Sequence, residues 1–262
     1  MTRPLSVQLY SVRDQLAADR EGTLRRLASL GYGAVEAYDV LDDAKGLRRI
    51  ADDLGLTVSG AHVIQLLGPE PGAVLDGVAA LGTELAIVPA GIPHEEFTSR
   101  DGLARTAERL NSLAVQAERH GLRLGYHNHW WEIEPRFDDA YSIDTARAAG
   151  GPHAVEVLAE LLDPAVFLEV DTYWAAVGGA EVPGLLRRLG DRVRALHLKD
   201  GPGTKEHPNV AVGGGTMPVP EILAAAPDAW RIVEFDSCAG SADTLFDELK
   251  ASHTYLTSLE AA

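Results

Sequence analysis

RVRALHLKDG, residues Arg192–Gly201, is an apolar run of strand length that stops in a His-Leu-Lys-Asp sequence. Leu196 and Leu198 alternate with His197 and Lys199, so the two polar side chains share one face of the expected strand. A lone strand histidine is more often a hydrogen-bonded core residue than a ligand, but a core does not normally accept three polar residues in four. The stretch therefore predicts a buried strand whose C-terminal end carries chemistry.

Three other apolar runs, far apart in the chain, stop in polar residues in the same way. FLEVD ends at Asp171, WRIVEF contains Glu234 and is followed by Asp236, and LGYHNH contains His127 and His129. Because the C-terminal ends of parallel strands meet at one mouth of a barrel, we expect these side chains to converge there. A mixed set of imidazole and carboxylate donors suits Mn²⁺, Co²⁺, Fe²⁺, Zn²⁺ or Mg²⁺ better than a thiolate-seeking metal.

Structural alternatives exist for these residues. Asp171 is equally suited to cap a helix that begins near Tyr173, and a buried Glu234 is also suited to a structural ion pair. YHNHWWE, which runs to Glu132, could be a loop of aromatic packing, but two histidines and an asparagine at a buried strand end need partners. Glu36 and His62 end two earlier runs, and we expect them either to line the pocket or to pair with each other.

Strand-like runs alternate with helical patterns along the whole chain, which predicts a single-domain (β/α)₈ barrel over residues 1–262. The expected strands are Leu5–Tyr10, Ala34–Tyr38, Thr57–His62, Leu85–Pro89, Leu122–His127, Val166–Asp171, Val193–Leu198 and Trp230–Phe235. The expected helices are Thr23–Leu30, Lys45–Leu54, Leu103–His120, Val155–Leu162, Val182–Leu189, Val219–Ala226 and Ala242–Leu259. A doubly wound open sheet is the alternative, but the turn at Leu9–Arg13 lacks the glycines of a phosphate-binding loop.

Three connections draw attention beyond the regular pattern. Glu134–Pro152 and Gly201–Pro220 are longer than a barrel needs, and both leave the C-terminal ends of strands, so they are candidate lids. VGGGTMP, residues Val212–Pro218, suggests a close backbone approach to a ligand or a mobile turn. It has no Lys-Ser or Lys-Thr ending and is therefore a weak candidate for a phosphate loop.

The composition bounds the class of protein. The chain has 262 residues and a formal net charge of −16, from 23 Lys and Arg against 39 Asp and Glu. Such an acidic surface repels phosphate backbones, so nucleic acid is a poor partner. One cysteine, Cys238, excludes an intramolecular disulfide. Neither a signal peptide nor a membrane span is visible, which favours a cytoplasmic protein, and a homo-oligomer is compatible with the sequence.

The ordered motifs resemble the xylose isomerase-like barrel superfamily, in particular the sugar phosphate isomerases/epimerases. The resemblance runs from SVQLYSVR through LASLGYGAVE, SGAHV, YHNHWWEIEP, EVDTYW, RVRALHLKDG and VGGGTMPVPEIL to IVEFD. It implies a divalent metal, often Mn²⁺, held by Glu, Asp, His and Glu on strands five to eight. Asp171, His197 and Glu234 match the last three ligands. His127 stands where the epimerases have Glu, and Trp174 where they have a substrate-binding His, so YHNH looks more like the inosose dehydratase and keto-sugar branch.

The resemblance and the residues together predict an enzyme that removes a proton next to a carbonyl of a sugar or cyclitol. Glu234 or His129 is the expected base, and Lys199 the expected acid or oxyanion stabiliser. We expect one metal per chain, bound by Asp171, His197, Glu234 and a strand-five residue, foremost His127.

The remaining expectations concern substrate contacts and the class of reaction. The expected substrate contacts are Glu36, His62, Glu132, Trp174 and Asp236. Isomerisation or epimerisation ranks ahead of elimination by a lyase. A multi-metal endonuclease IV-like hydrolase and a non-catalytic sugar-binding barrel are the further alternatives.

Overall fold

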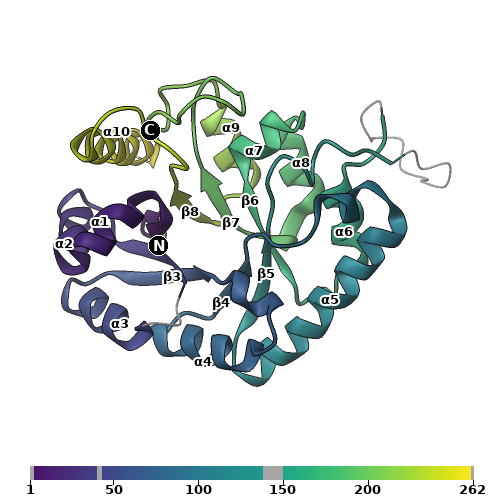
Figure 1. Cartoon of the computed structure of the whole chain (residues 1–262). Coiled ribbons are helices and arrows are strands. Elements are labelled where there is room, and N and C mark those ends of the chain that lie inside the picture. Colours follow the sequence, from purple (N-terminus) through teal and green to yellow (C-terminus); the bar gives the residue numbers. More distant parts are fainter. Residues whose placement is uncertain (1–2, 40–42, 138–149, 261–262) are drawn as a thin grey trace.

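The computed structural model describes residues 3–39, 43–137 and 150–260. Eight parallel strands close into a barrel in chain order, with β8 paired back to β1, and the helices surround this ring (Figure 1). The strands are β1 Ser6–Gln8, β2 Ala34–Tyr38, β3 Thr57–His62, β4 Leu85–Val88, β5 Arg123–His127, β6 Phe167–Asp171, β7 Val193–Leu198 and β8 Trp230–Val233. The predicted fold is confirmed, and the strand ends differ from those predicted by at most two residues.

The helices cover the outside of the barrel. They are α1 Arg13–Ala18, α2 Arg20–Ser29, α3 Ala44–Asp53, α4 Pro71–Leu81, α5 Arg100–Arg119, α6 Ala154–Leu161, α7 Thr172–Val177, α8 Val182–Leu189, α9 Val219–Ala225 and α10 Ala242–Glu260. Short 3₁₀ turns lie at Leu9–Val12, Ile64–Leu67, His94–Thr98 and Gly190–Arg192.

Three of these helices, α1, α4 and α7, are absent from the predicted set, although the capping interpretation of Asp171 did expect a helix at the position of α7. Helix α4 contains small residues and Gly77, which blur the apolar stripe, but its signals are visible afterwards: Pro71 lies at its first turn and Gly82 closes it with a φ of +76°. Helices α1 and α7 have six residues each, too few for a helical period to stand out.

The register between strands decides which side chains meet inside the barrel. His127 of β5 lies opposite Glu169 of β6, and Asp171 of β6 lies opposite His197 of β7. These inward positions alternate with outward apolar ones such as Leu196, which is fully buried beneath the helices. The barrel therefore has an apolar shell between strands and helices and a polar interior at its C-terminal mouth.

The ring is closed by contacts between the two ends of the chain. Helix α10, yellow in Figure 1, lies against the purple N-terminal helices. Arg26 of α2 pairs with Asp243 of α10 at 2.9 Å, and the hydroxyl of Tyr32 donates to the carbonyl of Leu249 at 2.9 Å. Across the described residues, no helix combines the length and the apolar character needed to cross a membrane.

Candidate active site and metal centre

A cavity of about 480 Å³ opens at the C-terminal mouth of the barrel. Side chains from several strand ends line it, among them His62, His127, His129, Lys199, Glu234 and Asp236, with Tyr10 and Ile64 at its rim. Both rim residues are large exposed hydrophobics, at 41% and 46% exposure. The mouth thus joins a polar floor to an apolar edge, which is typical of small-molecule sites.

Lys199 lies at the centre of the polar floor. Its Nζ is 2.8 Å from Glu234 Oε2, 2.8 Å from Asp236 Oδ2 and 2.9 Å from Asp171 Oδ2. Although burial opposes a charged amine, Asp171, Asp236 and Glu234 raise the pKa of Lys199 well above its usual value. The lysine is therefore a fixed ammonium group surrounded by carboxylates.

His197 lies below Lys199 and bridges two glutamates. Its Nδ1 is 2.5 Å from Glu234 Oε2, and its Nε2 is 2.7 Å from Glu36 Oε2. Burial favours the neutral ring, but Glu169, Glu234 and Glu36 outweigh it and raise the pKa of His197 well above its usual value. In turn, Lys199 and His197 overcome the burial of Glu234 and hold the pKa of that carboxyl well below its usual range.

Glu169 forms a second, deeper centre under the same rings. Its Oε2 is 3.0 Å from His127 Nδ1 and 3.3 Å from His197 Nε2, and it also bonds to His62 Nε2. The other nitrogen of each ring faces a carboxylate near Lys199. His127 Nε2 is 3.9 Å from Asp171 Oδ2, and His197 Nδ1 faces Glu234. The rings of His127 and His197 thus lie between two layers of carboxylates. We call Asp171 and Glu234, beside Lys199, the upper layer, and Glu36 and Glu169 the lower layer.

Asp171 both caps a helix and faces the cluster of metal-type donors, the two roles expected from the sequence. Its Oδ1 accepts a hydrogen bond from the backbone N–H of Trp174 at 2.8 Å and caps α7. Its Oδ2 faces Lys199 and the cluster. One carboxylate oxygen therefore fixes the side chain while the other is available to a ligand, which holds the group in a single orientation.

Burial sets the protonation of the remaining groups. It lowers the pKa of His62 to about 4 and, together with Lys199, that of His129 to about 3, and it lowers the pKa of His127 well below its usual value. Burial also raises the pKa of Asp171 to about 6 and, with Glu169, that of Glu36 to about 7. The rings of His62, His127 and His129 are therefore neutral and do not balance the negative charge of the neighbouring carboxylates.

The donor set fits a divalent cation. His127, Asp171, His197 and Glu234 each offer an atom within 4.8 Å of the others, and all four are buried. The lower group of His62, His127, Glu169 and His197 meets the same distance.

The excess of negative charge in the cluster also favours a divalent cation. Two cations, Lys199 and His197, face five carboxylates, those of Glu36, Glu169, Asp171, Glu234 and Asp236. Among the described residues, Glu169 Oε1 is buried with no hydrogen-bond partner. A divalent metal would compensate that excess, with His197 releasing its proton on binding.

A family model described as a xylose isomerase-like TIM barrel matches residues 24–229. The chain belongs to this family. The match covers most of the described strands and helices, and the predicted resemblance is confirmed. The sequence has no significant match among curated proteins.

Solved structures repeat the fold over nearly the whole chain. A sugar phosphate isomerase/epimerase from Parabacteroides distasonis is 23% identical with a TM-score of 0.79, covering 98% of this chain and 94% of its own. The probable 3-DHS dehydratase from Bacillus anthracis is 14% identical with a TM-score of 0.69, covering 97% and 99%. A xylose isomerase-like barrel from Mycobacterium smegmatis in complex with magnesium is 15% identical with a TM-score of 0.65, covering 98% and 96%.

Three residues predicted to contact substrate, Glu132, Trp174 and Glu36, bond to other side chains of this xylose isomerase-like barrel and do not line the cavity. Glu132 is fully buried, and its carboxylate accepts hydrogen bonds from the hydroxyl of Tyr126 at 2.7 Å and the backbone N–H of His129 at 2.8 Å. Trp174 donates from Nε1 to Asp236 at 3.1 Å. Glu36 lies in the lower layer, so of the predicted set His62 and Asp236 face the cavity directly.

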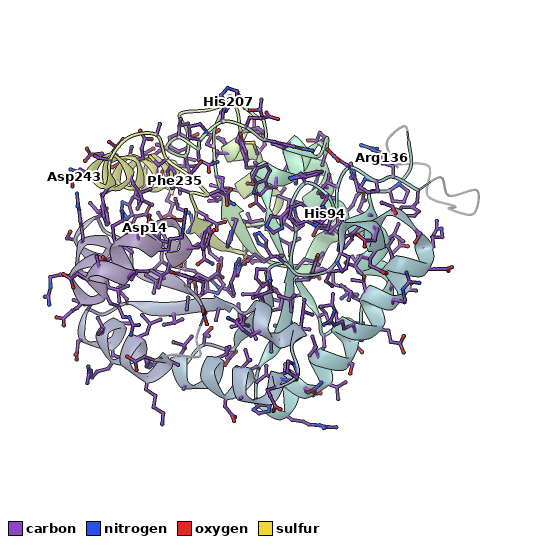
Figure 2. All side chains as sticks on the ribbon, viewed as in Figure 1. Asp14, His94, Arg136, His207, Phe235 and Asp243 are labelled. Carbon is purple, nitrogen blue, oxygen red and sulfur yellow. The ribbon has the colours of Figure 1, made fainter. Side chains whose placement is uncertain are left out.

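An aromatic wall continues the site on the side of β5. His129 stacks on Trp131 at 4.2 Å between ring centroids, and His94, labelled in Figure 2, stacks on the same tryptophan at 4.1 Å. Lys205 lies 3.1 Å from the centroid of the Trp130 ring. This wall explains the density of aromatic residues in YHNHWWE as packing that holds His129 against the cavity.

Glu169 is the cluster residue that the sequence interpretation missed. It lies two residues before Asp171 in FLEVD, so both side chains project to the same face of β6. A charged residue inside an apolar strand carries a large burial cost without partners. The two-residue spacing between Glu169 and Asp171 is therefore the signal in the sequence, although Glu169 lies inside the strand and not at its end.

The two candidate lids differ in what the structure describes. Most of Glu134–Pro152 lies outside the described residues. The segment after β7 is held by Asp200, whose carboxylate accepts backbone N–H groups of Gly201 at 2.8 Å, Gly213 at 2.9 Å and Met217 at 3.1 Å. The glycine-rich turn therefore approaches the protein's own carboxylate, where a Cβ at Gly215 would come within 2.2 Å of Asp200 Oδ1.

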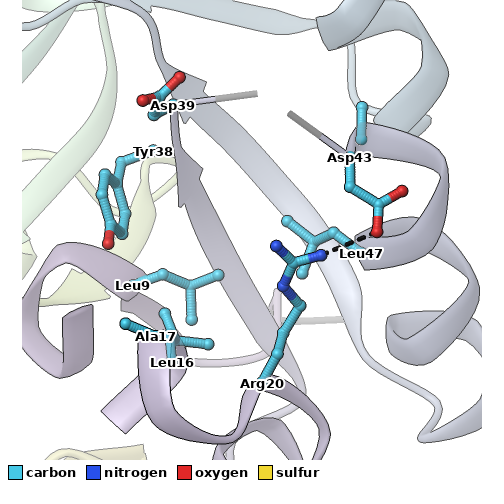
Figure 3. Close-up of a pocket in the computed structure, with 9 residues that line it drawn as sticks. Leu9, Leu16, Ala17, Arg20, Tyr38, Asp39, Asp43 and Leu47 are labelled. Carbon is cyan, nitrogen blue, oxygen red and sulfur yellow. Dashed lines mark hydrogen bonds and ion pairs between the residues drawn. The ribbon is translucent and has the colours of Figure 1, made fainter. Parts of the chain in front are cut away.

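A smaller cavity of about 260 Å³ lies beside the barrel between α1, α2 and α3 (Figure 3). Arg20 and Asp43 form an ion pair across it at 2.9 Å, and Leu9 and Leu47 supply apolar walls. It shares Tyr38 and Asp39 with the main cavity but contains no histidine. Among the described lining residues of these two cavities, imidazole donors are therefore confined to the main cavity, although Asp39 and Asp43 give the smaller one carboxylates.

Proposed function

We propose that this protein is a divalent-metal-dependent isomerase or epimerase acting on a keto-sugar or keto-cyclitol. The observation that carries the proposal is the position of Glu234 on the cavity floor, 2.8 Å from the ammonium group of Lys199 and beside the metal-type donors. These are the groups needed to remove a proton next to a carbonyl and to stabilise the negative charge that develops.

The upper layer supplies the metal ligands in this proposal. Asp171, His197 and Glu234 would hold the ion with His127 as the strand-five ligand, and Mn²⁺ is the first candidate for this mixture of imidazole and carboxylate. When bound, the ion supplies Lewis-acid polarisation of the substrate's oxygens. That a xylose isomerase-like barrel from Mycobacterium smegmatis forms a complex with magnesium supports a divalent ion in this proposal.

The chain's own residues would handle the proton. Glu234 Oε2 is engaged by His197 and Lys199, so Oε1 is the oxygen to accept the proton from carbon. Lys199 would donate a hydrogen bond to the oxygen that becomes negative, and its carboxylate partners keep it charged for that role. His129 lines the same cavity on the side of β5 and is the candidate to return a proton for epimerisation: its neutral ring would give its N–H proton to carbon while its other nitrogen takes a proton from water.

The charges of the cavity favour an unphosphorylated substrate. Among the described lining residues, Lys199 is the only lysine or arginine, and three carboxylates already surround it. Asp39, Glu234 and Asp236 also line the cavity and would repel a phosphate dianion. A neutral polyol with a carbonyl group fits these walls, and Tyr10 at the rim offers an apolar surface to its C–H face.

Hydrogen exchange at carbon tests the proposal. The Mn²⁺-loaded protein is incubated in D₂O with unphosphorylated ketohexoses and keto-cyclitols, and deuterium incorporation is followed by NMR. We expect exchange that is lost with a chelator and falls by orders of magnitude in Glu234→Gln at full metal occupancy. The exposed Glu221→Gln is the matched control. Wild-type exchange in Glu234→Gln would place the base elsewhere, and absence of exchange on the whole panel would contradict the proposal.

Elimination is the second candidate outcome from the same first step. Its support is the likeness to the probable 3-DHS dehydratase from Bacillus anthracis and the presence of His129 on the wall facing the cavity. In that case the leaving hydroxyl departs as water after proton removal, and the product is an unsaturated ketone. Its ultraviolet absorbance would rise with time, whereas an isomerase or epimerase would give no such band.

A further inference from the structure

The opposite, N-terminal mouth of the barrel contains a second polar cavity, of about 340 Å³. The starts of several strands build it: Arg123 begins β5, Arg194 is the second residue of β7, Trp230 begins β8, and Arg3 precedes β1. Three arginines thus meet at one mouth of a chain whose net charge is −16. This concentration is opposite in sign to the rest of the molecule.

These three guanidinium groups have no carboxylate partner among the residues that the structure describes. In the described parts of the chain, neither Arg3, Arg123 nor Arg194 forms an ion pair, whereas the neighbouring Arg231 pairs with Glu260. The Nε of Arg194 is buried and makes no hydrogen bond to any described residue. This lining residue therefore has one N–H donor without a protein acceptor, which is costly for a buried group.

The walls between the arginines are suited to an organic ligand. Arg3 lies over the Trp230 ring at 5.1 Å, which fixes its guanidinium at the edge of an apolar surface. Thr83 Oγ1 accepts the backbone N–H of Leu85 at 3.3 Å, so its hydroxyl hydrogen can donate. Glu84 is the one acidic side chain among the described lining residues, against three arginines.

We propose that this cavity binds a small multivalent oxyanion, a phosphate ester or a polycarboxylate, at the end of the barrel away from the catalytic cavity. Planar guanidinium groups pair bidentately with carboxylate and phosphate oxygens, and converging arginines favour an anion that carries several of them. The site is independent of the proposed catalytic function, because it shares no residue with the C-terminal cavity.

Calorimetric titration of the full-length protein with inorganic phosphate and, separately, with succinate tests this site. Both anions are used at low ionic strength, where charge pairing is strongest. Arg194→Gln and Arg123→Gln each remove one guanidinium and leave the strand backbone in place. Arg105→Gln, on the exposed face of α5 in the half near the other mouth, removes the same charge outside the cavity and is the matched control.

We expect one anion per chain, with affinity falling at least about tenfold in each cavity variant and unchanged in the control. Tighter binding of phosphate would point to a phosphate ester as the ligand, and tighter binding of succinate to a polycarboxylate. The proposal is overturned if neither anion binds the wild type, or if Arg194→Gln and Arg123→Gln bind as tightly as the control.

Discussion

Replacing Glu169 by glutamine should weaken metal binding and stabilise the metal-free protein. Glu169 is fully buried and accepts the hydrogen bond from His127 Nδ1, so it presents Nε2 of that ring to the upper ligands. Loss of such a carboxylate behind a metal-binding histidine costs about 10- to 100-fold in metal affinity. This corresponds to about 1.4 to 2.7 kcal/mol.

The stability effect has the opposite sign. Burial raises the pKa of Glu169, so the folded state binds its proton more tightly than the unfolded chain. The stability of the wild type therefore falls as pH rises above the unfolded value of about 4.3. Glutamine removes that ionisation, so the metal-free variant should be more stable than the wild type at pH 7 and equally stable near pH 4.

Two measurements check this pair of effects. Competition with a chelator gives the Mn²⁺ affinity of Glu169→Gln and of the exposed control Glu221→Gln. Thermal unfolding in excess chelator gives the metal-free stability at pH 4 and pH 7. Unchanged Mn²⁺ affinity in Glu169→Gln would refute the orienting role, and a variant less stable than the wild type at pH 7 would refute the charge argument.

Three further predictions follow from neighbouring residues. Lys199→Met should raise Mn²⁺ affinity by at least about tenfold, because the ammonium group competes with the metal for the carboxylates of Asp171 and Glu234. The same change should lower turnover by about 100- to 1,000-fold, because the ammonium group stabilises the negative charge that develops on the substrate. A Mn²⁺ affinity equal to that of a Lys205→Met control would contradict this prediction. Glu36→Gln should flatten the decline in metal-free stability between pH 4.5 and about 7, since burial, with help from Glu169, raises the pKa of Glu36 to about 7, and this loss is on the order of 3 kcal/mol. An unchanged pH profile of thermal unfolding would exclude it. Asp200→Ala should cost about 2 to 4 kcal/mol and expose residues 201–217 to proteolysis, because three backbone N–H groups lose their acceptor; cleavage at the wild-type rate would argue against that anchoring role.

The barrel fold, and the mouth of the barrel at which the candidate site lies, could be predicted from the sequence. Apolar runs of strand length at helix-sized intervals specify parallel pairing, because both faces of each strand must be covered. The polar ends at Asp171, His197 and Glu234 then fall at one mouth by topology alone. Helices α1 and α4 were not predicted because the local pattern is too short in α1 and interrupted by glycine in α4, and the helix at α7 was indicated only by the capping interpretation of Asp171.

Only the tertiary structure decided how the polar groups are shared. Lys199 touches three carboxylates from β6 and the segment after β8, and Glu169 reaches His62 across the barrel, contacts that no spacing along the chain encodes. Glu132, by contrast, turns back to Tyr126 and leaves the cavity. The sequence by itself determines which residues enter the barrel, since burial follows local alternation, whereas closure of β8 onto β1 determines which of them touch, since that depends on register and side-chain length across distant strands.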